Sequence, residues 1–213
     1  MKKNYFGESF SVFFLLTNVK AQVSNKDKEE IRALARKKIQ KSLPELMNTL
    51  NLDDVGEAER KNVMLNSYLP STDQLFFNDG VIVEDDLNPD RNPTDKPTDA
   101  NIGKYFNNYD LFYQKSANAT FEVSNVVVAE VKENNGQIYV QVFYRSIFKG
   151  KHKKKQTPYQ AQERVAEFKA EKIDKKWEVL ITRIAYHTPP KKRQLPKLIV
   201  LMRRKNYDRK SNY

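Results

Sequence analysis

Residues 164–188, RVAEFKAEKIDKKWEVLITRIAYHT, decide the fold class of this 213-residue chain. Apolar and polar side chains alternate in two runs, 162–173 and 176–187, as in β-strands with one buried face. Only a short turn around Asp174 and Lys175 separates the runs, so the two strands are antiparallel neighbours. The stretch therefore predicts a long β-hairpin.

Two more strands are predicted immediately before this hairpin. Alternation covers 120–132 and 137–149, and Asn134-Asn135-Gly136 forms the turn between them. A longer connection, which contains KGKHKKKQ at 149–156, joins this pair to the last one. A meander of four long antiparallel strands exposes one face to water unless helices cover it, so helices are expected against the sheet.

Helical periodicity precedes these strands. The predicted helices are one that begins near Ser24 and reaches Leu43, a short one around 44–50, one over 57–69 and one over 101–114. Pro44 is expected to end the first helix or to begin the second. Residues 74–84, QLFFNDGVIVE, predict a hairpin that turns at Asn78-Asp79-Gly80, and residues 85–99 predict a proline-rich loop.

Helices, a hairpin, a further helix and then four strands define an α+β domain. This order resembles the NTF2-like (cystatin-like, SnoaL-type) superfamily, in which N-terminal helices pack on a strongly curved, mainly antiparallel sheet that forms a cone. The resemblance covers residues 24–188, and the leader described next makes it look like the secreted bacterial type. It implies a homodimer formed through the sheet and a ligand, small and apolar or a protein, of unknown identity. In enzymes of isomerase, dehydratase or cyclase type it implies polar groups inside the cone.

The first 21 residues predict a signal peptide. Two lysines precede an apolar run, FSVFFLL, at 10–16, and Val19-Lys20-Ala21 fits a signal peptidase that cleaves between Ala21 and Gln22. Glu8 and the short run depart from the pattern, and a buried N-terminal strand or helix is the alternative. The run is too short for a transmembrane helix, which needs about 20 apolar residues. We expect a periplasmic or secreted protein.

Most of the net charge of +11 lies at the two ends of the chain. Residues 189–213 carry a net charge of +8 and residues 1–21 carry +2, which leaves +1 for the predicted domain at 22–188. A nearly neutral body argues against a domain built to hold nucleic acid. The basic tail at 189–213 is expected to be flexible, or to contact an anionic membrane surface. The absence of cysteine excludes disulfides, thiol catalysis and Cys-bound zinc.

A lysine-rich stretch occupies the connection between the second and third long strands. Its members are Lys149, Lys151, Lys153, Lys154 and Lys155. Contact with a polyanion is one interpretation, and it supports the alternative of a cytosolic basic nucleic-acid-binding protein. Nucleic-acid sites usually add several aromatic rings for stacking, and few lie nearby. A solvated loop is the preferred interpretation, with His152 exposed in it and nucleic acid not expected as a partner.

The stretch DLNPDRN resembles a calcium-binding loop, because Asp86, Asn88 and Asp90 alternate as its ligands would. Arg91 stands where such a loop needs glycine, and Pro97 where it needs glutamate. We therefore expect a polar loop and no bound metal.

Five residues are candidates for lining a pocket in the cone. Tyr105, Tyr109 and Tyr113 share one apolar face of the predicted helix 101–114, which either lines a ligand cavity or packs against the sheet. Arg145 lies in the middle of a strand, and His187 closes the last strand. None of these residues belongs to a recognisable catalytic motif. We therefore expect a non-catalytic binding or interaction domain without a cofactor, and an NTF2-like enzyme is the alternative.

Overall fold

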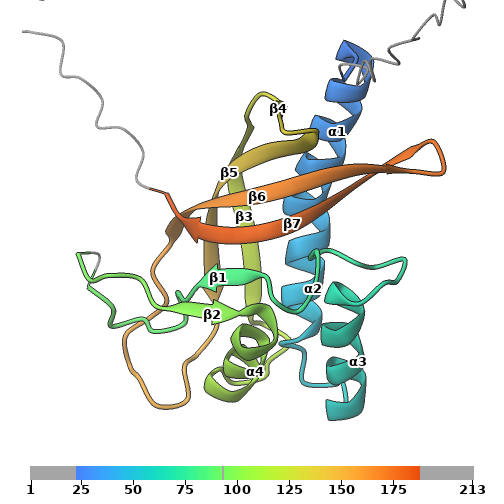
Figure 1. Ribbon diagram of the computed structural model, residues 1–213. Helices are drawn as coiled ribbons and strands as arrows, with labels where there is room; N and C mark the ends of the chain where they lie inside the picture. The colour runs from blue at the N-terminus through green and yellow to red at the C-terminus, as the bar shows by residue number, and fades with distance from the viewer. Residues whose placement is uncertain (1–22, 93, 188–213) are drawn as a thin grey trace, which may run out of the picture.

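The computed structural model describes residues 23–92 and 94–187 (Figure 1). Its helices are α1 (Asn25–Lys37), the π-helical turn η1 (Lys38–Ser42), α2 (Leu43–Thr49), α3 (Glu57–Tyr68) and α4 (Ile102–Phe112). Its strands are β1 (Ile82–Glu84), β2 (Asp99–Asn101), β3 (Thr120–Val128), β4 (Lys132–Asn134), β5 (Gln137–Lys149), β6 (Gln162–Ile173) and β7 (Lys176–Tyr186). Within these ranges no helix has the length and apolarity needed to cross a membrane. The predicted signal peptide and basic tail lie outside the described residues.

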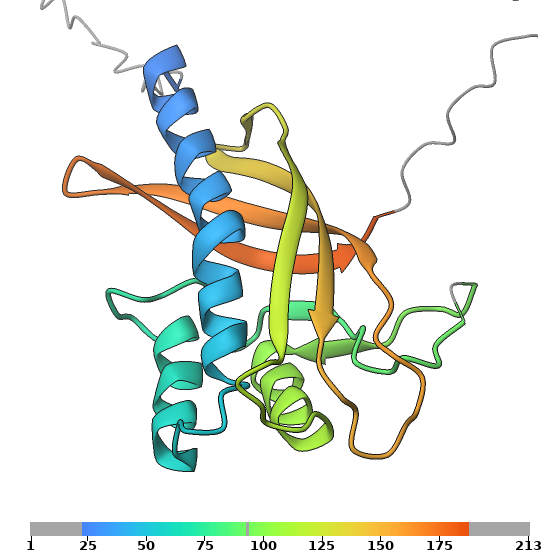
Figure 2. The same cartoon turned by 180° about the vertical axis from the view of Figure 1, so that it is seen from behind.

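The elements α1, η1 and α2 follow one another as a single long rod, drawn in blue in Figures 1 and 2. The rod begins after Ser24, whose side chain accepts a hydrogen bond from the amide of Asp27. Pro44 stands in the first turn of α2, directly after η1. Proline has no amide hydrogen, and its ring crowds the carbonyl of the preceding turn, so the wider π-turn lets the rod continue through it. Pro44 therefore begins a helix without interrupting the rod.

The seven strands form one sheet in the order β2-β1-β7-β6-β5-β3, and β4 pairs with β5. All pairs are antiparallel except β1 with β7. Asn135, Gly136, Asp174 and Lys175 have positive φ, as two-residue hairpin turns require. The α+β fold class is confirmed, and the four long predicted strands are present, with the first of them split into β3 and β4.

Two β-bulges curl the sheet. One lies in β3 between Ser124 and Val127, where Asn125 has φ 54°. The other lies in β7, where Thr182 is an extra residue opposite β6. A bulge bends its strand and increases its twist. The curled sheet wraps around the helical rod, which lies in front of it in Figure 2, and this gives the predicted cone.

The bulge in β7 also changes which residues face the core. Unbroken alternation along this strand predicts that Ile181, Arg183 and His187 share one face. Ile181 does face the core, but after Thr182 the inward residue is Ile184. Arg183 and His187 consequently lie on the outer face of the sheet, so the sequence prediction of a shared face was wrong.

The hairpin predicted for residues 74–84 does not form. A turn does occur at Asn78-Asp79-Gly80, but the segments on both sides of it run parallel to β7. The Phe77 amide donates to the Ile181 carbonyl at 2.8 Å, and Ile82 pairs with Arg183. The edge of β7 thus supplies backbone hydrogen-bond partners to both segments. This pairing outweighs the tendency of Asn78-Asp79-Gly80 to form a hairpin.

The core lies between the inner face of the sheet and the helices. Ile31, Ala35 and Ile39 of the rod are fully buried there. α4 contributes Phe106 and Tyr109, which are also buried. The packing therefore fills the interior of the cone mainly with aliphatic and aromatic side chains.

Candidate functional site

A polar cluster lies inside the cone, among side chains that are otherwise apolar. Asp86 follows β1, Tyr105 is on α4, Tyr159 is in the loop before β6, and Arg164 is on β6. The four residues are 8% exposed or less. Buried charges need a partner of opposite charge or several hydrogen bonds, so the geometry of this cluster decides whether it is structural or functional.

Asp86 is the acceptor at the centre of the cluster. The hydroxyl of Tyr105 donates to its Oδ1 at 2.9 Å, and that of Tyr159 donates to its Oδ2 at 2.5 Å. Arg164 Nη1 lies 3.8 Å from Asp86 Oδ2, which is an ion pair but too long for a hydrogen bond. Arg164 Nη2 donates to the backbone carbonyl of Glu84 at 2.8 Å. The carboxylate is thus held by two donors and one cation.

The electrostatics keep the tyrosines of the cluster protonated. Burial raises the pKa of Tyr105 and of Tyr159 well above its usual value, and the nearby Asp86 charge adds to the effect. Burial also raises the pKa of Tyr144 to about 12. The hydroxyls of Tyr105 and Tyr159 are therefore protonated at neutral pH and donate to Asp86. Nη1 of Arg164 is the least satisfied polar atom of the cluster, because it is buried and has no hydrogen-bond partner in the described part of the chain.

The cavity beside this cluster is very small. It has a volume of about 20 Å³, and Asp86, Tyr144 and Arg164 line it together with apolar side chains. That is room for about one water molecule, whereas small-molecule sites occupy roughly 300–1,000 Å³. The interior of the cone is therefore filled in this conformation.

Aromatic packing accounts for the filling. The rings of Tyr109 and Phe148 are 5.1 Å apart and edge-to-face, and those of Tyr113 and Phe148 are 4.8 Å apart. The hydroxyl of Tyr113 donates to the Leu87 carbonyl at 3.0 Å. The aromatic face of α4 thus packs against the sheet, which is the second of the two interpretations that the sequence left open.

Two loops close the wide end of the cone. They are residues 85–98 and 150–161, and they lie side by side at the lower left of Figure 1. Lys155 Nζ is 2.6 Å from Asp90 Oδ2, which ties one loop to the other. The guanidinium groups of Arg91 and Arg164 both stack on the Tyr186 ring, with their carbon atoms 4.3 and 4.5 Å from the ring centroid. Access to the polar cluster would require these loops to move apart.

Three of the five predicted pocket residues lie inside the cone, and the other two lie on the outer face of the sheet. Tyr105, Tyr109 and Tyr113 point into the interior and are buried. Arg145 is exposed on the outer face, 3.6 Å from Glu163. His187 lies on the outer face against Phe143, with ring centroids 4.6 Å apart. The structure therefore brings the three tyrosines together and places Arg145 and His187 outside the cone.

The lysine-rich stretch is attached to the fold at several points. Lys149 pairs with Glu122 at 2.5 Å, and Lys155 pairs with Asp90. The Lys153 amide donates to the Phe112 carbonyl at 2.7 Å. Lys151 and Lys154 are exposed. The five lysines therefore do not form one continuous cationic surface, because two of them are paired with carboxylates.

His152 anchors this loop, contrary to the expectation that it is exposed. It is 8% exposed, and its ring stacks on Phe112 and meets Tyr113 edge-to-face. Its Nδ1 accepts hydrogen bonds from the amides of Lys154 and Lys155, both at 3.1 Å. Burial lowers the pKa of His152, as do the neighbouring lysines. A neutral imidazole therefore holds the turn of the lysine loop against α4.

The calcium-like spacing does not bring its residues together as ligands. Asp86 turns inward to the tyrosines, whereas Asp90 pairs with Lys155 and the Asn88 side chain accepts from the Asp90 amide. Among residues 23–92 and 94–187, no group of three or more His, Asp or Glu side chains could hold a metal ion.

The outer face of the sheet carries an apolar row. Helices cover the other face only, as the two opposite views show. The row crosses four strands in register and consists of Val127, Phe143, Val165 and Ala185. Val127 is 60% exposed. Phe143, Val165 and Ala185 are half-buried, so the row offers a partly exposed apolar surface to a partner.

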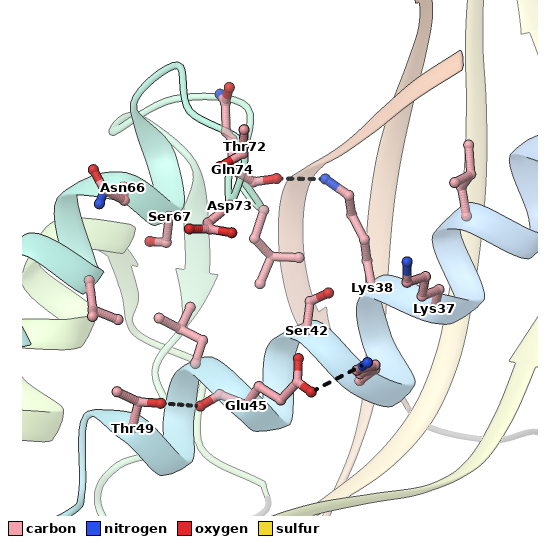
Figure 3. A pocket seen from close by; sticks show the side chains of 15 residues that line it. Lys37, Lys38, Ser42, Glu45, Thr49, Asn66, Ser67, Thr72, Asp73 and Gln74 are labelled. Carbon is pink, nitrogen blue, oxygen red and sulfur yellow. Dashed lines mark hydrogen bonds and ion pairs between the residues drawn. The ribbon is translucent and has the colours of Figure 1, made fainter. Parts of the chain in front are cut away.

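A groove of about 480 Å³ lies between the helical rod and α3 (Figure 3). One wall is formed by the end of α1, by η1 and by α2, and the other by α3 and residues 72–75. Lys38 crosses it, and its Nζ donates to the Gln74 carbonyl at 2.6 Å. Burial lowers the pKa of Lys38 to about 8. Its volume is far larger than that of the cavity beside the polar cluster.

Sequence reasoning missed Arg164, Tyr159 and Asp86 as one cluster. Arg164 could have been found from the sequence, because alternation places it on the same buried face of the strand as Ala166 and Phe168. A charged residue on the apolar face of a strand predicts a buried ion pair. Asp86 had no such signal, since it stands in a polar loop.

Comparison with protein-family models and with curated proteins finds no match. Several solved structures are similar in fold. An NTF2-like protein of unknown function from Shewanella baltica has 11% identity and a TM-score of 0.36, covering 79% of this chain and 99% of that one. A proposed scytalone dehydratase from Novosphingobium aromaticivorans has 12% identity and a TM-score of 0.37, covering 76% and 93%.

A proposed aromatic ring hydroxylase from the same organism has 13% identity and a TM-score of 0.37, covering 79% of this chain and 94% of that one. The NTF2-like fold is recognised from the order of the elements and from the curled, mostly antiparallel sheet around the helices.

Proposed function

We propose that this protein is a non-catalytic interaction domain that acts outside the cytoplasm and pairs with a second copy of itself through the outer face of its sheet. The observation that carries this proposal is the filled cone. A cavity of about 20 Å³ admits no substrate, while an apolar row stands uncovered on the other face. The function then belongs to surfaces of the domain.

The outer face is suited to a second copy because its charges are self-complementary. Next to the apolar row, Arg145 and Glu163 stand opposite each other on β5 and β6. A twofold axis along the strands, between β5 and β6, would set Arg145 of each copy over Glu163 of the other. The same axis would set Phe143 over Val165. An isologous interface needs this kind of pattern, in which one patch complements itself.

Export is supported by the leader alone. Two lysines, the apolar run at 10–16 and Val19-Lys20-Ala21 have the layout of a signal peptide. The absence of cysteine is compatible with an oxidising compartment. The intact mass of the native protein from fractionated cells tests this part of the proposal. A secreted or periplasmic species that begins at Gln22 is expected, and a full-length cytosolic species would contradict it.

Self-association is tested by light scattering after size exclusion, on the chain from Gln22 to Tyr213. We expect a dimer, and we expect Phe143→Arg to convert it to a monomer, because the new charge would be buried at the centre of the apolar row. Leu111→Arg is the matched control, since Leu111 is 61% exposed on α4, away from the sheet face. A wild-type monomer at about 100 μM, or a dimer unchanged by Phe143→Arg, would refute the pairing.

An enzyme of dehydratase or isomerase type is the second candidate. Asp86 favours it, because a buried carboxylate with two hydroxyl donors is a group that acid–base chemistry uses. A substrate would have to part the two loops over the cone. A ligand that stabilises the wild type but not an Arg164→Met variant, together with turnover lost on Asp86→Asn, would favour this candidate over the first.

A further inference from the structure

We propose that the groove between the helical rod and α3 binds a small amphipathic carboxylate, with its headgroup at the lysines of η1 and its apolar body against the floor of the groove. The groove lies on the helices, and the outer sheet face lies on the other side of the domain, so this site is independent of the proposed self-association. Figure 3 shows it from close by.

The size and lining of the groove suit a small molecule. Its volume of about 480 Å³ falls within the range of ordinary ligand sites. Its apolar lining comes from both walls and consists of Leu34, Leu46, Val63 and Leu75. Leu75 is buried, and the other three are half-buried, so an apolar chain laid over them would remove further surface from water. A body of roughly six to ten carbon atoms fits this volume.

The headgroup is specified by charge. Lys37, Lys38 and Lys41 all line the groove from the end of α1 and from η1. Two carboxylates, Glu45 and Asp73, line it as well, so the empty groove keeps an excess of one positive charge. An anion restores the balance, and a cation would add to the imbalance.

Lys38 is the residue best placed to hold the anion. Its ammonium group has three donors, and the Gln74 carbonyl accepts from it at 2.6 Å. Lys38 is half-buried, so a charge-assisted hydrogen bond there is less screened than at the surface. Lys41 is only loosely paired, at 3.9 Å from Glu45 with both side chains more than 60% exposed. The lysines can therefore turn toward a ligand at little cost.

The π-turn explains why these lysines gather at the groove. η1 spans Lys38–Ser42 and precedes Pro44, which rules out a regular α-helical turn at that point. A π-turn has more residues per turn, and such turns often occur at functional sites. The π-turn and two of the three groove lysines, Lys38 and Lys41, thus occupy the same segment.

Titration calorimetry with sodium octanoate tests the proposal on the full chain. Octylammonium is the control ligand, since it has the same chain and the opposite charge. We expect octanoate to bind and octylammonium not to bind. Lys38→Met is expected to weaken octanoate binding roughly tenfold to a hundredfold, the loss of one charge-assisted hydrogen bond. Lys61→Gln, an exposed lysine on α3 outside the groove lining, is the matched control and should leave the affinity unchanged.

Two further variants keep the test decisive if Lys38→Met does not fold. Lys37 and Lys41 are exposed, so the double variant Lys37→Gln/Lys41→Gln should fold normally, and it is expected to weaken octanoate binding as well. Lys38→Arg retains the charge and should retain binding. Equal binding of octanoate and octylammonium, or unchanged affinity in the Lys37→Gln/Lys41→Gln protein, would overturn the proposal.

The pH dependence adds a second signature. The charged groups near Lys38 are Lys37, Lys41, Glu45 and Asp73 of the groove and Glu178 of β7. Because Lys38 loses its proton more readily than an ordinary lysine, octanoate affinity should fall between pH 8 and pH 10. The Lys38→Arg protein should show no such fall. A flat profile in the wild type would contradict the role of Lys38, whatever happens to self-association.

Discussion

Replacing Asp86 by asparagine should destabilise the protein more than replacing its partner Arg164. In Asp86→Asn the guanidinium stays buried, with 2% of the residue exposed, one carbonyl acceptor at Glu84 and no carboxylate. Breaking a buried pair in this way costs about 3–5 kcal/mol. For a chain of this size that lowers Tm by roughly 6–20 °C. In Arg164→Met the carboxylate keeps both tyrosine donors, so we expect a smaller loss of about 1–3 kcal/mol.

The double variant Asp86→Asn/Arg164→Met gives the sharper test. With both charges gone the cluster needs no ion pair, so the double variant should be about as stable as Arg164→Met alone. The coupling between the two sites then equals the whole loss in Asp86→Asn, about 3–5 kcal/mol. Urea unfolding followed by circular dichroism measures the four free energies. Additive losses, or a loss below about 1 kcal/mol for Asp86→Asn, would show that Arg164 does not depend on Asp86 and would refute this account of the cluster.

Three further predictions concern other parts of the fold. Gly150→Ala should cost about 2–3 kcal/mol in urea unfolding, because a Cβ there would lie 2.1 Å from the Phe148 ring. Gly56→Ala, whose Cβ would have no atom within 4 Å, should cost no more than about 1 kcal/mol, the preference for glycine over alanine at the N-cap of α3. The pKa of His152 is lowered, so the folded protein binds a proton there less readily than the unfolded chain, and the lysine loop should loosen as pH falls from 7 to 5. Hydrogen exchange at the Lys154 and Lys155 amides, which donate to His152, should therefore lose protection over this range, and the same pH response in a His152→Gln protein would contradict this. The pKa of Lys38 is about 8 in the folded protein and 10.5 for an ordinary lysine, so Lys38 loses its proton at lower pH when the chain is folded. The free energy of unfolding should therefore rise from pH 8 to pH 10.5 in the wild type. A similar rise in Lys38→Met would show that another group causes it.

The candidate sites differ in how far the sequence could reveal them. Tyr105 and Tyr109 of α4 and Tyr113, which directly follows it, were predicted as one apolar face, because helical periodicity indicates which side of a helix is apolar. These tyrosines fill the interior of the cone and do not line a ligand cavity, because Phe148 of β5 packs against Tyr109 and Tyr113. Phe148 is distant from them in the sequence. The groove depends on Lys38 of η1 meeting Gln74 in the segment after α3, and no spacing in the sequence predicts this contact.

The sequence by itself determined the fold class, most of the helices and the four long strands. Period-two alternation, short turns and proline positions are local properties, and they predicted β5, β6 and β7 almost to the residue. Only the tertiary structure decided which face each residue occupies. One extra residue at Thr182 reverses the alternation of β7 and moves His187 to the outer face. The edge of β7 likewise takes up both arms of the hairpin predicted at 74–84. Such outcomes depend on backbone partners that are distant in sequence, so no local pattern records them.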